Sequence, residues 1–323
     1  MTSSAKLAAG LLVVLALAAV SLFIGVSDVS LQSLFSSAPE DRPMQVLLIS
    51  RVPRTLALVL AGSALSVAGL LMQMLARNRF VEPSTAGTVE SASLGLLVVT
   101  IFAPGWPLLG KMAVAAVFAL MGTALFMRLL AAMPLRSPLV VPLVGIMLGG
   151  VISAVTTFFA YRYDLLQTLG AWTMGDFSGV LRGRYELLWL AAGLTLVAWL
   201  AADRFTVAGL GEAFTTNLGL NYSRVLALGL TIVAMVTAVV VVTAGSIPFL
   251  GLIVPNLVSS WMGDNTRRSI PWVALLGAGL VLASDIVGRL VRFPYEIPIG
   301  TVFGVAGSLV FLWLLLGRRR QLG

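Results

Sequence analysis

Long apolar runs, separated by short segments that carry charged residues, proline or glycine, recur along the whole chain. Most are close to 20 residues long, the length that a helix needs to cross a hydrocarbon core of about 30 Å. The strands of a membrane barrel would instead show as segments of about 10 residues in which polar and apolar side chains alternate. The pattern therefore predicts an all-α integral membrane protein with ten transmembrane helices, at about 7–26, 52–76, 88–103, 110–130, 137–160, 186–202, 224–244, 247–262, 270–288 and 297–316.

The distribution of basic residues sets the expected orientation of these helices. An even number of spans places both ends of the chain on one side of the membrane, and a modest excess of the 21 lysines and arginines falls on that side. Arg77, Arg79 and the three arginines at 318–320 account for most of the asymmetry. Because cytoplasmic loops are enriched in Lys and Arg, we expect both termini to be cytoplasmic and residues 1–323 to form a single transmembrane domain.

Composition agrees with a membrane location and excludes several kinds of site. Hydrophobic residues make up 59% of the chain and charged residues 11%, with a mean hydropathy of +1.02, and a water-soluble domain could not keep that much apolar surface from solvent. The chain has no cysteine and no histidine, which excludes disulfides, thiolate or imidazole metal sites and histidine-based catalysis. We expect no cofactor and no metal ion, and we interpret the net charge of +8 as loop charge beside lipid rather than a nucleic-acid surface.

Two arginines interrupt the apolar pattern in the stretch LLISRVPRTLALVL (47–60). An arginine at the centre of a membrane helix costs about 2.5–3.5 kcal/mol on insertion scales, so Arg51 and Arg54 should lie at an interface, with residues 55–76 crossing the membrane. The expected orientation places them at the outer interface. From composition alone, contact with lipid head groups explains these arginines as well as contact with a partner protein does.

The segment RVPRTLALVLAGSALSVAGLLMQMLARNRFVEPSTAGT (51–88) resembles the FecCD-type permeases of bacterial ABC importers for iron siderophores and vitamin B12. Their pattern has R-x-P-R, a helix rich in small residues, a glutamine, an RNP-like element and P-x-x-x-G. The resemblance continues in order through GEAFTTNLGLNYSR (211–224), GSIPFLGLIVPN (245–256), ASDIVGRL (283–290) and EIPIGTVFGVAGSLVFLWLL (296–315). It implies the type II ABC importer permease fold, with ten transmembrane helices and both termini cytoplasmic.

By this resemblance, Arg51, Arg54 and Arg289 lie at the outer mouth and receive glutamates of a solute-binding protein. A guanidinium suits that role because it stays charged and its planar fork matches a carboxylate. Each exposed pair contributes only about 0.2–1 kcal/mol, so several would act together on orientation and association rate. Asp285 lies one helical turn before Arg289 and is expected to form a supporting ion pair that neutralises or aims it.

A second element implied by the resemblance is a coupling segment, at about 204–224, that fits a cleft on an ATPase subunit. The local sequence suits a short helix with Glu212 in its first turn and Gly219 as its stop. Without the resemblance, an ordinary interfacial loop is the simpler interpretation. The residues expected to make the coupling contact are Gly211, Glu212, Ala213, Leu218, Gly219 and Leu220.

The chain should not itself be an enzyme, because it has no site for ATP. GWPLLGKM (105–112) imitates the spacing of a Walker A motif, but Met112 replaces the Ser or Thr, Pro107 lies inside it, and no strand is expected before it. Lys6 is the only other lysine, so no P-loop exists elsewhere in the chain. ATP would therefore be bound by a partner chain, and the resemblance described above implies two separate ATP-binding subunits.

The remaining partners and the cargo follow from the resemblance. The stretch ARNRFVEPSTAGTVESASLG (76–95) is most similar to the branch that imports catecholate or petrobactin-like siderophores, and such branches generally pair two different permease chains. We therefore expect a second permease subunit, in a heterodimer rather than a homodimer. A periplasmic or lipid-anchored binding protein would deliver a ferric siderophore, and the location would be the bacterial inner or plasma membrane, in contact with membrane lipid.

The pathway implied by the resemblance runs between two permease subunits, along the fifth and tenth predicted helices (137–160 and 297–316). These helices are rich in Gly, Ser, Thr, Val and Ile, and a lining with few charges favours passage of a polar chelate over retention. Glycines spaced by four should let helices pack closely. Two such pairs are Gly145/Gly149 and Gly300/Gly304.

Three positions depart from the family pattern and bear on the gate and the substrate. Asn256 and Ser259 stand where V-P-H and a following arginine are common, and Leu309 replaces the proline of a G-x-P element. A vitamin B12 or haem importer of the same family is the nearest alternative function. From another class, an ion-coupled secondary transporter would need intramembrane acids or bases, and only Asp285, with Arg289 as its partner, is counted as one; a rhomboid-like protease would lack its histidine.

Overall fold

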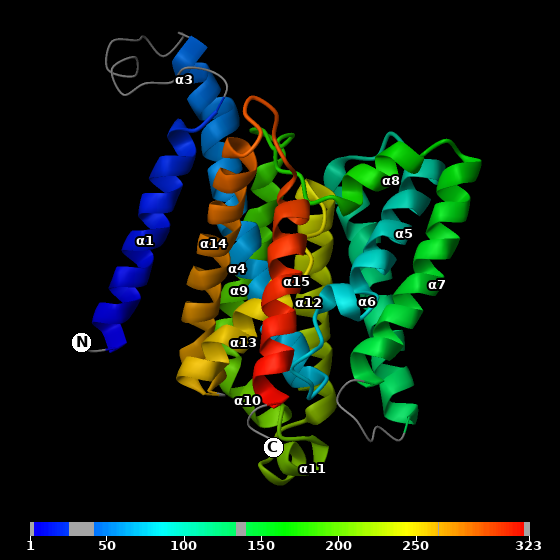
Figure 1. Ribbon diagram of the computed structural model, residues 1–323. Helices are drawn as coiled ribbons and strands as arrows, with labels where there is room; N and C mark the ends of the chain where they lie inside the picture. Colours follow the sequence, from blue (N-terminus) through cyan, green and yellow to red (C-terminus); the bar gives the residue numbers. More distant parts are fainter. Residues whose placement is uncertain (1–2, 26–41, 134–139, 264, 320–323) are drawn as a thin grey trace.

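The computed structural model describes residues 3–25, 42–133, 140–263 and 265–319, and every regular element within these ranges is helical (Figure 1). The helices in chain order are α1 (Ser3–Phe23), α3 (Arg42–Val46), η1 (Leu47–Arg51), α4 (Val52–Leu75), η2 (Pro83–Thr85), α5 (Thr88–Phe102), α6 (Leu108–Ala132), α7 (Val140–Arg162), α8 (Leu166–Thr173), η3 (Tyr185–Leu187), α9 (Leu188–Leu200), α10 (Ala202–Ala208), α11 (Glu212–Asn217), α12 (Tyr222–Ala244), α13 (Leu250–Met262), α14 (Thr266–Leu290) and α15 (Ile299–Arg319).

Each of the ten predicted spans overlaps one helix of this series, but α9 and α13 have only 13 residues each and α5 has 15. Within the described ranges, six helical runs are long and apolar enough to cross a membrane, and the pair formed by η3–α9 and α10, bent by 66°, makes a seventh. Other apolar helices are shorter: the 15 residues of α5 extend about 22 Å, less than the hydrocarbon thickness. The all-α membrane class is therefore confirmed, while the number of ten crossings stays a prediction.

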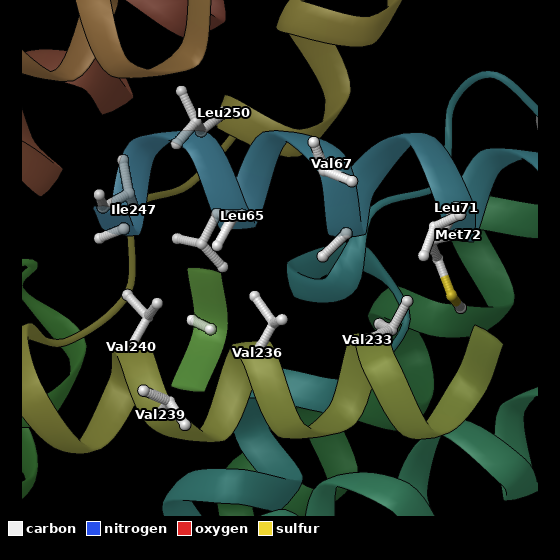
Figure 2. Close-up of a cluster of buried hydrophobic side chains, with 14 of the residues drawn as sticks. Leu65, Val67, Leu71, Met72, Val233, Val236, Val239, Val240, Ile247 and Leu250 are labelled. Atoms are coloured by element: carbon white, nitrogen blue, oxygen red, sulfur yellow. The ribbon is translucent and has the colours of Figure 1, made fainter. Parts of the chain in front are cut away.

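The central helix is α4, which packs against α9, α12, α13 and α14 (Figure 1). Most of its residues are buried, as expected for a helix that is apolar or small on every face. Figure 2 shows how its side chains meet those of α12 and of the segment that leads into α13. The labelled residues are Leu65, Val67, Leu71 and Met72 of α4, Val233, Val236, Val239 and Val240 of α12, Ile247 and Leu250.

Small residues let α4 approach its neighbours at backbone distance. A Cβ atom added at Gly69 would overlap the backbone of Gly251 in α13, and one added at Gly62 would lie 2.7 Å from the carbonyl oxygen of Gly277 in α14. Close approach of this kind is how membrane helices gain packing energy without a hydrophobic driving force between them. The small-residue helix after the R-x-P-R element thus forms the core of the bundle.

The N-terminal end of α4 differs from the expected start of the membrane span. The chain is helical from Arg42 onward, so Arg51 and Arg54 lie inside a helical run rather than before it. Pro53 has no N–H to offer the carbonyl one turn earlier, and that carbonyl, of Ile49, accepts a hydrogen bond of 3.0 Å from the backbone N–H of Arg182 instead. The loop before α9 is thereby fastened to the start of α4.

The two ends of the bundle carry different elements (Figure 1). The N-terminal end of α1, the C-terminal end of α15 and helices α10 and α11 lie at one end, whereas α3, η1 and the loop between α14 and α15 lie at the other. The expected docking and coupling elements are therefore at opposite ends of the molecule.

Candidate functional site

The end of the bundle opposite α11 contains a network of charged side chains centred on Asp285. Asp285 lies on α14 with its side chain fully buried, and its Oδ1 accepts from Arg54 Nη2 at 2.7 Å and from Arg54 Nε at 3.1 Å. Arg54 also pairs through Nη1 with Glu296 Oε2 at 2.7 Å. Because two carboxylates flank it, Arg54 is a satisfied, nearly buried guanidinium, with 13% of its side chain exposed.

Arg289 completes the network from the next turn of α14. It forms an ion pair with Asp285 Oδ2, so the predicted supporting pair is present, and Asp285 in addition serves Arg54. Arg289 Nη1 donates to the carbonyl oxygens of Ser21 (3.0 Å) and Ile24 (2.7 Å) at the C-terminal end of α1. A cation at this position also interacts favourably with the negative end of the helix dipole.

Arg51, like Arg289, donates to a backbone carbonyl near the C-terminal end of α1. Its Nη1 donates to the carbonyl oxygen of Leu22 at 2.8 Å, and the residue is 6% exposed. Pairing of this kind lets arginines lie within a helical run, because their charge is compensated inside the protein rather than at the lipid surface. The structure thus brings the three predicted arginines together, but Arg51 and Arg289 are turned inward and bind α1. Contact of Arg51, Arg54 and Arg289 with a partner protein stays a prediction.

At the other end, α10 and α11 form a short projection. The predicted start and stop of the coupling helix are confirmed: Glu212 opens α11, and Gly219 follows it with a left-handed φ of 78°. The N–H of Leu220 bonds the carbonyl of Thr215 at 3.0 Å, and that of Gly219 bonds Thr216 at 2.9 Å, which is the Schellman arrangement that ends a helix at glycine.

The surface of this projection is apolar and exposed. Leu210, Phe214 and Leu218 are each 61% exposed, and Glu212 and Ala213 are also on the surface. Thr215 is buried instead, and its hydroxyl donates to the carbonyl of Gly211 at 2.7 Å, which fixes the turn that begins α11. Three large apolar side chains at the tip of a loop are typical of a surface that a partner covers.

The sequence profile of the FecCD transport family matches residues 11–317. The chain belongs to the FecCD transport family. The chain is 49% identical over 304 residues to the petrobactin import system permease protein YclN of Bacillus subtilis (strain 168), covering 94% of this chain and 95% of that protein. It is 40% identical to the ferric-anguibactin transport system permease protein FatD of Vibrio anguillarum, over 93% of this chain and 95% of the relative.

A solved structure supports the fold of this FecCD protein. The chain matches a metal-chelate type ABC transporter in an inward-facing conformation with a TM-score of 0.80 and 25% identity, covering 98% of this chain and 99% of the other. The arrangement of the helices in this chain therefore matches that of a solved ABC transporter.

The expected pathway helices of this FecCD protein, α7 and α15, both present bare apolar faces. Leu143, Ile146 and Val151 of α7 and Val305 and Leu309 of α15 are each more than half exposed. These faces suit contact with lipid or a second subunit. Their role in a pathway stays a prediction.

Close packing at the glycine pairs is confirmed for one member of each pair. A Cβ at Gly145 would overlap the Thr85 carbonyl oxygen, and one at Gly300 would overlap that of Met174. Gly149 and Gly304 have more room, with nearest atoms at 3.3 and 3.6 Å.

The three departures from the family pattern lie in different surroundings. Asn256 is buried and its Nδ2 donates to the carbonyl of Arg79 at 2.7 Å, which ties α13 to the segment after α4. Ser259 lines a cavity of about 270 Å³ that also contains Arg77, beside α10. Leu309 is 65% exposed on α15.

The sequence analysis did not single out two acids, Glu82, which is buried, and Glu90, which is partly buried. Glu82 is 2% exposed, and its Oε1 accepts from the N–H of Phe249 (2.8 Å) and from Ser84 Oγ (2.5 Å) at the start of α13. Glu90 lies in the first turn of α5, inside a predicted span where Asp285 alone had been counted as an intramembrane acid. A glutamate three residues into the predicted span 88–103 was the signal that could have found it.

Proposed function

We propose that this FecCD protein is the transmembrane permease subunit of an ATP-driven ABC importer that moves a ferric siderophore from a binding protein to the cytoplasm by alternating access. The observation that carries the proposal is the 49% identity, over nearly the full length of both chains, to a petrobactin import permease. The ferric-anguibactin relative supports the same class of cargo. A vitamin B12 or haem chelate is the alternative cargo within the family.

The two ends of the bundle bind different partners. The binding protein docks at the end that carries Arg54 and Glu296, where carboxylates of the partner meet a guanidinium already held in place by Asp285. Arg51 and Arg289 support this surface by fixing the end of α1. At the opposite end, the apolar tip formed by Leu210, Phe214 and Leu218, together with Glu212, enters a cleft on an ATPase subunit, which binds the ATP.

The membrane arrangement follows from the same assignment. The chain crosses the membrane ten times, with both termini and α11 on the cytoplasmic side, in the inner or plasma membrane of a bacterium. This arrangement is supported by Figure 1, in which the N-terminal end of α1, the C-terminal end of α15 and helix α11 lie at the same end of the bundle. The bare faces of α7 and α15 pair with a second, different permease chain, and two ATP-binding subunits complete the importer.

Reconstitution of the complete importer in proteoliposomes tests this function. Uptake of a ferric siderophore should require ATP on the side of the ATPase subunits and the binding protein on the other. Uptake driven by an imposed proton or sodium gradient without nucleotide would instead identify an ion-coupled transporter, for which the buried Glu82 and Asp285 and the partly buried Glu90 would be coupling candidates.

A further inference from the structure

A cavity of about 370 Å³ lies among α5, α7 and α8. Its volume falls in the range of small-molecule sites, about 300–1,000 Å³. Its polar lining includes Glu90 and Ser93 of α5, Ser153, Thr156 and Thr157 of α7 and Thr173 of α8. Ser153 and Thr157 are exposed on α7, so the cavity opens toward the face that is expected to line the pathway.

Three hydroxyl groups of this lining, those of Thr156, Thr173 and Ser246, present acceptors rather than donors. A hydroxyl has one proton and two lone pairs, and several of the protons here are already used. Thr156 Oγ1 donates to the carbonyl of Ile152 at 2.7 Å, and Thr173 Oγ1 donates to that of Gly170 at 3.0 Å. Ser246 Oγ, also in the lining, donates to the carbonyl of Thr173 at 3.2 Å. The lone pairs of these oxygens remain for a ligand.

Two buried polar atoms of the lining have no partner within the described residues, Glu90 Oε2 and Ser93 Oγ. Ser93 is 3% exposed, and a buried polar group without a hydrogen bond costs about 1–3 kcal/mol. A Cβ added at Gly149 would lie 3.3 Å from Glu90 Cδ. The lack of a side chain at Gly149 therefore makes room for the carboxyl group of Glu90. None of the described residues that line the cavity is basic.

We propose that this cavity binds an alkylammonium group, a protonated amine on a short hydrocarbon chain, carried by the imported chelate. The carboxylate of Glu90 and the hydroxyl oxygens accept its N–H groups, while Val89, Leu166 and Leu169 contact its methylene groups. A bare transition-metal ion fits poorly, because the described residues contain no group of three or more metal-binding side chains. The inference rests on the proposed function, since the amine arrives with the cargo.

Uptake by the complete importer in proteoliposomes tests the proposal with two ferric chelates, identical except that one carries a free amine arm and the other its N-acetyl derivative. Glu90→Gln should raise KM for the amine chelate about tenfold or more, the effect of losing a hydrogen bond to a charged group. It should leave KM for the acetylated chelate unchanged. Asp164→Asn makes the same chemical change at an exposed carboxyl group and should alter neither value.

The outcomes separate this inference from the proposed function. Equal KM values for the two chelates in both the wild type and Glu90→Gln would overturn the amine site while leaving ATP-driven import intact. Absence of ATP-driven uptake in the wild type would instead remove the proposed function.

A direct binding measurement does not depend on transport or on a stable variant. Saturation-transfer NMR on the wild-type complex in nanodiscs should show contact with propylammonium and none with 1-propanol at equal concentration. An equal signal from both probes would overturn the proposal. An ethanolamine head group has the same chemistry, so the measurement is repeated with and without phosphatidylethanolamine; loss of the propylammonium signal in its presence would assign the cavity to lipid and overturn the link to cargo.

Discussion

The two ends of the bundle differ in how their side chains are partnered. At one end, Arg51, Arg54 and Arg289 bind Asp285, Glu296 and the last carbonyls of α1. At the other, Leu210, Phe214 and Leu218 are 61% exposed and have nothing over them in the monomer. The charged side chains of the first end are held by contacts within the chain, whereas the second end leaves large apolar side chains exposed, as a surface for a partner would. Substitutions at the first end should therefore act mainly on stability, and those at the second on assembly.

The largest effect is expected for Asp285→Asn. The change leaves the guanidinium groups of Arg54 and Arg289 without their shared buried carboxylate, and breaking a buried ion pair typically costs about 3–5 kcal/mol. Thermal unfolding of the purified protein in detergent measures the loss. Asp203→Asn is the matched control, because its pair with Arg267 is exposed on both sides and should contribute less than about 1 kcal/mol. A similar decrease in unfolding temperature for both variants would contradict the central role of Asp285.

Truncation of the apolar tip comes next. Phe214→Ala and Leu218→Ala should each weaken association with the ATPase subunit by about 1.5–3 kcal/mol, the value of burying one large apolar side chain, without lowering the unfolding temperature. Binding of the purified ATPase subunit to the permease in nanodiscs gives the affinity. Thr216→Ala, on the same helix, is the control. Unchanged affinity in both tip variants would argue against this surface as the coupling contact.

A smaller effect is expected at the stop of α11. Gly219 has a φ of 78°, a left-handed conformation that costs a residue with a Cβ about 1–2 kcal/mol of conformational free energy. Gly219→Ala should therefore speed hydrogen exchange of the Leu220 N–H, which is bonded to Thr215, by roughly 5–30-fold. Gly219→Asn should have a smaller effect because asparagine tolerates the left-handed region. Equal exchange rates in all three proteins would show that the Schellman turn does not hold the helix end.

The smallest effect concerns docking by Arg54. Arg54→Gln should weaken binding of the solute-binding protein by no more than about 1 kcal/mol, the upper value for an exposed ion pair, and the difference should shrink as salt is raised. Arg54→Gln should also lower the unfolding temperature, because it breaks the pair with the buried Asp285. Arg51→Gln should lower the unfolding temperature without weakening docking, since Arg51 holds the end of α1. Docking affinity over a salt series, measured beside thermal unfolding, separates the two. A larger docking loss for Arg51→Gln would reverse this distinction.

Much of the fold could be predicted from the sequence because it depends on local pattern. The apolar runs located the helices, Gly219 marked the end of α11, and the glycine pairs indicated close packing at Gly145 and Gly300. The FecCD resemblance, carried by motifs in a fixed order, was confirmed by the family match.

The burial of the charged residues could not be predicted, because it depends on residues far apart in the chain. Nothing near Arg51 indicates that Leu22 accepts its hydrogen bond, and nothing near Asp285 indicates that Arg54 shares it with Arg289. The cost of inserting a single arginine into a membrane predicts a position at the interface. Contacts with carboxylates and carbonyls inside the protein instead allow these arginines to lie within a helical run. The same limit hid the cavity beside Glu90, whose walls come from three helices.

The contacts at the end of α1 have a consequence for biogenesis. The carbonyl oxygens of Ser21 and Ile24 receive their hydrogen bonds from Arg289, a residue synthesised more than two hundred positions later. Until the ribosome has delivered α14, the hydrogen bond from Arg51 to Leu22 is the polar contact described for this end of α1. The contact with Arg289 then joins α1 to α14, two helices that the ribosome makes far apart in time.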